Sequence, residues 1–209
     1  MIKVILCDDH AVVRRGVRDT LMEATDIKVI GEADGYASLR ALIRQQRPDV
    51  LLLDVDLPGR SGLEILVSLQ EDNPPISTVM VSMYPEDQYA LRCLKAGAMG
   101  YLNKGGDPAD LLTAVRTVAQ GRKFITPQIA ELLANHLSAP ESAELHDSLS
   151  ERELQTLRKI ASGKKLSQIA EELMISPKTV SVYRARVLEK LGMSNNAELT
   201  VYAIRNKLV

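Results

Sequence analysis

The chain has 209 residues, and its 45% hydrophobic and 25% charged side chains are typical of a globular protein and exclude a disordered or fibrous one. Six Tyr, one Phe and no Trp are too few aromatics for a platform that stacks single-stranded nucleic acid. Asp54 and Asp56 interrupt the richest apolar stretch, so no run reaches the roughly 18 residues of a membrane span. The length predicts one or two domains. Because the N-terminal segment does not resemble a secretion signal, we expect the protein in the cytoplasm, without membrane attachment.

Charge is distributed unevenly along the chain. Residues 1–147 carry 15 basic and 21 acidic side chains, net −6, and residues 148–209 carry 11 and 6, net +5, which together give the whole-chain −1. A basic C-terminal third predicts a module that binds a polyanion, although a solvated helical surface has the same composition.

The first 122 residues alternate short apolar, β-branched runs with longer amphipathic patterns. Strands are predicted at 3–7, 28–33, 50–54, 78–82 and 100–102, and helices at 12–23, 36–46, 63–71, 86–96 and 108–120. Five βα repeats with near-continuous apolar strands predict an α/β fold, in which a doubly wound, five-stranded parallel sheet is covered by helices on both faces.

The remainder of the chain has a helical pattern. One further helix is expected after Pro127, and the segment SAPESAELHD, residues 138–147, is typical of a linker. Ser150 and Glu153 form a capping-box pattern that starts an all-α, four-helix domain. Its helices are predicted at 150–162, 166–174, 177–191 and 196–206. The expected domains are therefore 1–122, a helix and linker at 123–147, and 148–209.

Polar residues follow four of the five predicted strands. Asp8 and Asp9 follow the first strand, Asp54 ends the third, Ser82 ends the fourth and Lys104 lies just beyond the fifth. Ligands of open α/β sheets bind at the carboxyl ends of the strands. Asp and Ser also cap helices and a lysine is at home in a solvated loop, but the five together predict one site.

Carboxylates held close together need a compensating cation. Two of them at 4 Å repel by roughly 4 kcal/mol at an effective dielectric constant near 20. A hard divalent ion, Mg²⁺ above all, relieves this repulsion and leaves positions open for phosphate oxygens. An Asp carboxylate can then attack a phosphoryl group, while Lys104 neutralises its oxygens and the Ser82 hydroxyl donates to them.

These residues carry a family resemblance. The segments IKVILCDDH, LLLDVDLPGRSG, VMVS and GYLNK resemble the receiver domain of two-component response regulators, over residues 1 to about 122. The resemblance implies that Asp54 is the phosphoacceptor, that a sensor histidine kinase is the donor, and that Asp8, Asp9, Asp54 and the backbone carbonyl of Asp56 hold Mg²⁺. It makes Ser82 the switch hydroxyl, Tyr101 the switch aromatic and Lys104 the phosphate-pairing lysine. Tyr101 also fits a purely structural role in a short buried strand.

An enzyme is the rival interpretation. Asp54-Val55-Asp56 after an apolar strand also resembles the nucleophile and acid pair of haloacid-dehalogenase-type phosphatases. That family needs a further acidic motif downstream, and the candidate around Asp107 and Asp110 has the wrong spacing. The acidic pair lies upstream instead, which favours a receiver that is not an enzyme.

The C-terminal helices have the pattern of a helix-turn-helix. The segments LSQIA and ISPKTV place two helices around a tight turn, and the second helix carries cations on one side and apolar residues on the other. Such a helix can enter the DNA major groove, with cations on phosphates and N-terminal side chains on base edges. A helical bundle for protein contact is the alternative.

A second resemblance favours DNA. LSERELQTL, SQIAEEL, SPKTVSVYRARVLEKLGM and NAELTVYAI resemble the DNA-binding domain of LuxR-type regulators, and a receiver joined to this domain defines the NarL/FixJ subfamily. The resemblance implies groove contacts by Lys178, Ser181, Val182 and Ala185, and backbone contacts by Thr179, Arg184 and Arg186. It places the dimer contact at 196–206. We therefore expect a phosphorylation-dependent transcription regulator that binds double-stranded promoter DNA as a homodimer.

Overall fold

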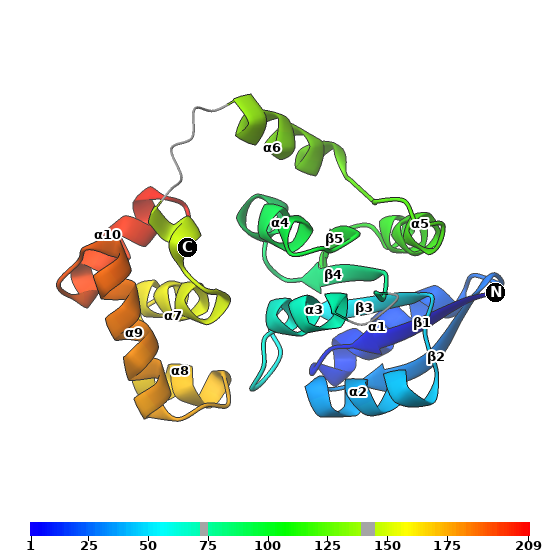
Figure 1. The fold of residues 1–209 in the computed structure, drawn as a ribbon, viewed down its shortest axis with the longest axis horizontal. Coiled ribbons are helices and arrows are strands. Elements are labelled where there is room, and N and C mark those ends of the chain that lie inside the picture. Colours follow the sequence, from blue (N-terminus) through cyan, green and yellow to red (C-terminus); the bar gives the residue numbers. More distant parts are fainter. Residues whose placement is uncertain (72–74, 139–144) are drawn as a thin grey trace. The chain divides into compact units, whose positions relative to one another are not determined.

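A computed structural model describes residues 1–71, 75–138 and 145–209, which fall into two compact units, Met1–Ser138 and Ala139–Val209 (Figure 1). Most of the predicted linker, residues 139–144, lies outside the described residues. Each unit is taken by itself below.

The first unit is built on a five-stranded parallel sheet. Its strands are β1 (Ile2–Cys7), β2 (Ile27–Ala33), β3 (Val50–Asp54), β4 (Thr78–Ser82) and β5 (Gly100–Asn103). Their order across the sheet is β2-β1-β3-β4-β5, and every neighbouring pair is parallel. The predicted doubly wound α/β sheet is confirmed, with β1 and β2 starting one residue earlier than expected and β5 ending one residue later.

Helices cover both faces of this sheet (Figure 1). They are α1 (Ala11–Met22), α2 (Tyr36–Gln45), α3 (Gly62–Gln70), α4 (Glu86–Lys95) and α5 (Pro108–Ala119). Alternate strand residues such as Val4, Leu6 and Leu52 are buried in one cluster with Leu21 of α1 and Val115 of α5. Intervening residues are also buried, which explains why the strands are apolar at nearly every position.

A sixth helix, α6 (Pro127–Ser138), extends the first unit beyond residue 122. It packs on α4, with Ile129 fully buried. The Thr126 hydroxyl accepts a hydrogen bond from the Ile129 backbone N–H (3.2 Å) and donates one to Glu86 Oε2 (2.6 Å). The start of α6 is thereby attached to the start of α4.

The second unit is entirely helical in its described part. A short 3₁₀ helix, η1 (Leu145–Ser148), precedes α7 (Glu151–Ala161), α8 (Leu166–Glu172), α9 (Pro177–Leu191) and α10 (Asn196–Arg205), which confirms the four predicted helices. Ser150 and Glu153 form the predicted capping box. The second helix ends earlier than predicted because Met174 adopts a left-handed conformation, φ 51°, which stops the helix. Across the described parts of both units, no helix is long and apolar enough to cross a bilayer.

Candidate functional site

The parallel strands bring the predicted phosphate-site residues together at one edge of the sheet. Lys104 Nζ lies 2.7 Å from Asp8 Oδ2 and 2.8 Å from Asp54 Oδ2. The exposed fraction is only 4% for the lysine side chain and 2% for the Asp54 side chain. Three residues that are distant in sequence therefore form one buried, ion-paired centre.

Four candidate metal-ligating side chains meet in this centre. Asp8, Asp9, His10 and Asp54 each offer a ligand atom within 4.8 Å of the others. The sequence analysis gave His10 no role. Its Nδ1 lies 2.8 Å from Asp9 Oδ1, and its backbone N–H donates to Asp8 Oδ1 (2.8 Å). The direct adjacency of His10 to the acidic pair was the only sequence signal for this contact.

Burial and charge have opposite effects on Asp54. Burial raises the pKa of its carboxyl from 3.8 to about 6, against the lowering effect of Lys104. Burial by itself lowers the pKa of Lys104, but the Asp54 and Asp8 carboxylates outweigh it and raise that pKa. Asp54 Oδ2 is paired with the Lys104 ammonium, and Asp54 Oδ1 accepts from the Asp56 backbone N–H. A cluster of three carboxylates offers the hard oxygen ligands that a divalent cation such as Mg²⁺ prefers.

The predicted switch residues lie around Tyr84, in the loop between β4 and α4. The Tyr84 backbone N–H donates to Ser82 Oγ (3.2 Å), and the Tyr101 hydroxyl donates to the Tyr84 carbonyl (2.8 Å). The Tyr84 hydroxyl donates to Asp56 Oδ2 (2.8 Å), and the Asp56 backbone N–H donates to Asp54 Oδ1 (3.2 Å). Tyr84, which the sequence analysis missed, thus connects the loop after β3 with Ser82 and with the fully buried Tyr101.

Gly62 allows the first turn of α3 to lie directly against Asp54. An added Cβ at this position would lie 1.8 Å from the Asp54 backbone oxygen. Ser61 caps the helix through a capping box with Glu64, so the start of α3 is fixed. The Ser-Gly pair in LPGRSG therefore determines how closely the start of α3 approaches the end of β3.

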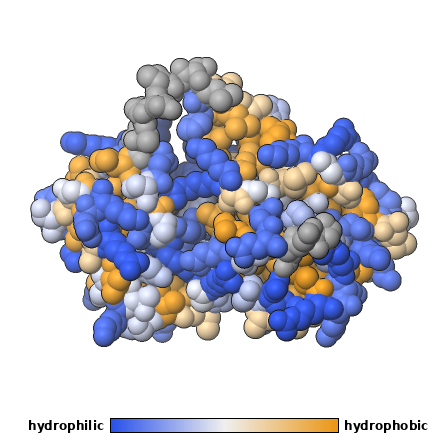
Figure 2. Space-filling model, in the orientation of Figure 1, coloured by the Kyte–Doolittle hydropathy of each residue, from blue (hydrophilic) through white to orange (hydrophobic). Residues whose placement is uncertain are grey.

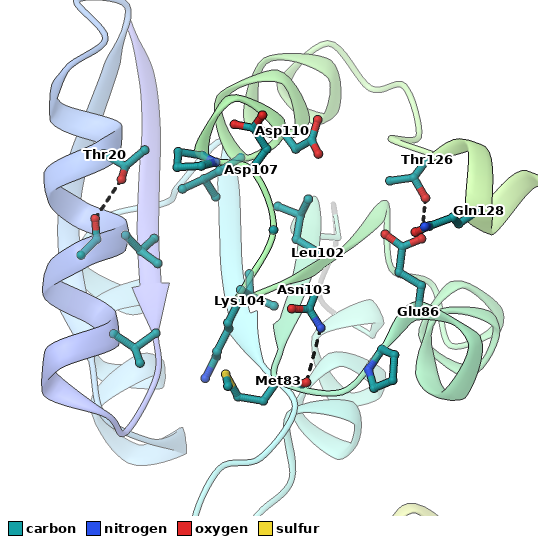
Figure 3. Close-up of a pocket in the computed structure, with 18 residues that line it drawn as sticks. Thr20, Met83, Glu86, Leu102, Asn103, Lys104, Asp107, Asp110, Thr126 and Gln128 are labelled. Carbon is teal, nitrogen blue, oxygen red and sulfur yellow. Dashed lines mark hydrogen bonds between the residues drawn. The ribbon is translucent and has the colours of Figure 1, made fainter. Parts of the chain in front are cut away.

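A hollow of about 530 Å³ lies beside Lys104, in the first unit. Figure 3 shows Lys104 and Met83 close together in it, and Glu86 beside Thr126. Val13 and Val17 of α1 line it, and Asp107 and Asp110 add acidic groups at the start of α5. This hollow, which has apolar and acidic parts, therefore adjoins the ion-paired centre at Lys104.

In the second unit, α9 presents the predicted DNA-contact residues on one side. Those that are solvent-exposed are Lys178, Ser181, Val182, Ala185 and Arg186, and those that are half-buried are Thr179 and Arg184. Val180, Val187 and Leu191 on the opposite side are buried in the unit. The Arg184 Nε donates to Asn196 Oδ1 (2.5 Å), so α10 orients this guanidinium.

The surface of this unit carries apolar side chains among polar ones. Figure 2 shows hydrophilic and hydrophobic residues intermixed on the face that it draws. Among the larger apolar side chains, Val182 is 43% exposed on α9, and Val201 and Ile204 are 48% and 60% exposed on α10. Both helices therefore have apolar side chains available for contacts outside the unit.

Comparison with known proteins identifies a family for each of the two units. Residues 4–116 match the response regulator receiver domain, and residues 147–203 match the luxR family of bacterial regulatory proteins. The chain thus belongs to the family of two-component response regulators that join a receiver to a LuxR-type DNA-binding domain, the NarL/FixJ type. Members of this family are transcription regulators and not enzymes, so the phosphatase interpretation is excluded. A receiver implies a histidine kinase as partner.

Particular relatives resemble the whole chain. Response regulator GacA of Pseudomonas aeruginosa is 40% identical over 210 residues, which cover 100% of this chain and 98% of the relative. Response regulator UvrY of Escherichia coli is 39% identical, with coverage of 100% and 96%. A structure of RcsB from Salmonella typhimurium matches with a TM-score of 0.70 and 26% identity over 96% of both chains. RcsB from Salmonella enterica serovar Typhimurium, bound to promoter rprA with the phosphomimetic BeF3⁻, matches with a TM-score of 0.66 and 25% identity, over 96% of this chain and 97% of that one.

Proposed function

We propose that a sensor histidine kinase phosphorylates this response regulator on Asp54 and that the phosphorylated chain binds promoter DNA as a homodimer. The observation that carries the proposal is the buried Asp54 carboxylate, paired with Lys104 beside Asp8. Both partners of the chain, the kinase's phosphorylated domain and the chromosome, are reached from the cytoplasm, which we propose as its location.

Mg²⁺ is the metal that we assign to the acidic centre. Its proposed ligands are the carboxylates of Asp8, Asp9 and Asp54 and the backbone carbonyl of Asp56, which are the hard oxygen donors that this ion prefers. When bound, it supplies positive charge to the oxygens of a phosphoryl group.

The side chains of this centre have distinct proposed roles in phosphoryl transfer. An Asp54 oxygen attacks the phosphorus of the donor phosphohistidine, so that a P–O bond forms as the P–N bond breaks and the imidazole leaves. Lys104 moves its ion pair to an oxygen of the transferred group. The Ser82 hydroxyl donates to another, while its Oγ still accepts from the Tyr84 N–H. Because Tyr101 also bonds to Tyr84, occupancy of the site is transmitted to this aromatic side chain.

The output of the protein is DNA binding by α9. We assign base-edge contacts to Lys178, Ser181, Val182 and Ala185, and phosphate contacts to Thr179, Arg184 and Arg186. The small groove-facing side chains favour the reading of methyl groups and DNA shape. RcsB, a relative solved in complex with promoter DNA, supports DNA binding as the output.

The proposed division of labour follows the domains. Residues 1–122 receive the phosphoryl group and residues 148–209 bind DNA. Residues 123–147 connect them, and within this segment α6 packs on α4 of the first unit. The exposed Val201 and Ile204 of α10 supply the dimer contact, and a two-fold dimer reads inverted half-sites about one DNA turn apart.

Intact-mass analysis with acetyl phosphate and Mg²⁺ tests the phosphoacceptor. One acid-labile phosphoryl group should attach to the wild type and to Asp87→Asn, a control at an exposed position of α4. Asp54→Asn should remain unlabelled because an amide is a poor nucleophile. Labelling of Asp54→Asn at the wild-type level would overturn the assignment.

A further inference from the structure

Arg14, on the first helix, contacts the main chain of the acidic centre. Its Nη1 donates to the backbone carbonyl of Asp8 (2.5 Å), and its Nε donates to Glu32 Oε2 on β2 (3.1 Å). Neither residue was singled out by the sequence pattern. We propose that Arg14 is a positioning residue that orients Asp8 and Asp9 for the metal ion. This inference rests on the Mg²⁺ site of the proposed function.

The argument starts from the peptide that joins the two aspartates. The Asp8 backbone N–H donates to the Ala33 carbonyl (3.1 Å), which continues the ladder between β1 and β2. The carbonyl of Asp8 follows this N–H in the main chain and lies just beyond the end of β1 at Cys7. The Arg14 guanidinium binds this carbonyl, and because a peptide group is planar, this contact also fixes the N–H of Asp9. The directions in which both carboxylates leave the main chain are thereby set.

Arg14 is itself held in place. Its side chain is 19% exposed, and it lines the same small pocket as Asp8 and Asp54. Glu32 accepts from Arg14 through one carboxylate oxygen and from Arg18 through the other, each at 3.1 Å. The planar guanidinium fork can bind a carbonyl and a carboxylate together, which a lysine ammonium cannot reproduce with the same geometry.

The charge of Arg14 and its geometry have opposite effects on Mg²⁺ binding. A guanidinium near a cation site repels the cation, so if Arg14 acted by charge alone, Arg14→Ala would bind Mg²⁺ more tightly. If it orients the ligands, its loss weakens binding, and the loss of a residue that orients metal ligands typically costs 10–100-fold in affinity. We therefore expect Arg14→Ala to raise the Mg²⁺ dissociation constant by about ten-fold or more.

The experiment is calorimetric titration of the full chain with Mg²⁺ alone, with the unfolding midpoint of every variant measured alongside. Arg14→Lys keeps the charge and should still weaken binding several-fold. Arg18→Ala is the matched control, since Arg18 shares Glu32 with Arg14 but binds Asp19 in place of Asp8, and its affinity should equal that of the wild type. Glu32→Gln leaves Arg14 in the chain and removes the carboxylate charge that anchors it, so it should weaken binding even if Arg14→Ala does not fold.

The outcomes separate the two proposals. Wild-type protein that does not bind Mg²⁺ would overturn the metal site of the proposed function. Wild-type binding with equal or tighter binding by Arg14→Ala would overturn the positioning role alone. The role would also fail if Arg14→Lys matched the wild type, or if Arg18→Ala lost as much affinity as Arg14→Ala.

Discussion

Lys104 and Asp54 form an ion pair of 2.8 Å in which both side chains are almost fully removed from solvent. Desolvation makes such a pair costly to form, and removal of one partner leaves the other charge buried without compensation. Loss of either side chain should therefore destabilise the fold, and in the proposed function the same lysine also binds the phosphoryl group on Asp54.

Lys104→Met should separate these two roles. Without Mg²⁺, we expect the free energy of unfolding at pH 8 to fall by roughly 3 kcal/mol, because the carboxylates of Asp8 and Asp54 lose their buried partner. Saturating Mg²⁺ should restore most of this stability but not the rate at which acetyl phosphate labels the protein. Denaturant unfolding with and without Mg²⁺ and timed intact-mass measurements check both parts. Full labelling speed in Lys104→Met would remove the lysine from the transfer step.

The raised pKa of Asp54 predicts a pH dependence. In the folded state this pKa is about 6, above the ordinary 3.8, so the protonated carboxyl stabilises the fold below pH 4 and this contribution is lost as the pH rises through 6. Relative to Asp54→Asn, the wild type without Mg²⁺ should therefore lose up to about 3 kcal/mol of stability between pH 4 and pH 7, at 1.36 kcal/mol per pKa unit. A stability difference between the two proteins that stays constant from pH 4 to pH 7 would be inconsistent with burial of this carboxyl.

The contact between Gly62 and the Asp54 carbonyl predicts a steric effect. Gly62→Ala forces α3 away from β3 and should lower the free energy of unfolding by about 1–3 kcal/mol or more, with slower labelling of Asp54. Gly16→Ala is the control, because an added Cβ in this turn of α1 has nothing within 4 Å. That variant should gain about 0.5–1 kcal/mol from the better helix propensity of alanine. Equal effects of the two substitutions, measured by denaturant unfolding, would argue against the close approach.

Arg184 and Val182, both on α9, should affect DNA binding in different ways: Arg184 its strength and Val182 its sequence preference. Arg184→Ala should weaken binding equally on all duplexes and reduce the slope of log affinity against log salt by about 0.9, because it removes one phosphate contact. Asn196→Ala should have a weaker effect of the same kind, since Asn196 orients the Arg184 guanidinium. Val182→Ala should change the preference among bases instead. Titrations at several salt concentrations on duplexes selected from a random pool measure both quantities, and identical changes in specificity for Arg184→Ala and Val182→Ala would contradict the assignment.

The sequence predicted the fold well because both domains depend on patterns that are local in the chain. Apolar strands and amphipathic helices of a βα repeat have different periods, and caps such as Ser150 mark the helix starts. The residues of the phosphate site could also be predicted, since the carboxyl ends of parallel strands meet at one edge of the sheet.

The supporting contacts could not be predicted in this way. Tyr84 reaches Asp56 across 28 residues of sequence, and Arg14 meets Glu32 across 18. Such contacts depend on how two elements pack and leave no periodic signal in the sequence. The end of α8 was also missed. Met174 adopts a left-handed conformation there, and a methionine, unlike a glycine or an asparagine, does not signal this conformation in the sequence.

Genome-wide DNA occupancy of the wild type and of Asp54→Asn, each with and without acetyl phosphate and Mg²⁺, tests the central claim most directly. We predict that phosphorylation increases the occupancy of a defined set of inverted-repeat sites by the wild type and leaves Asp54→Asn unchanged. Equal occupancy by both proteins, with or without the phosphodonor, would contradict phosphorylation of Asp54 as the control of DNA binding.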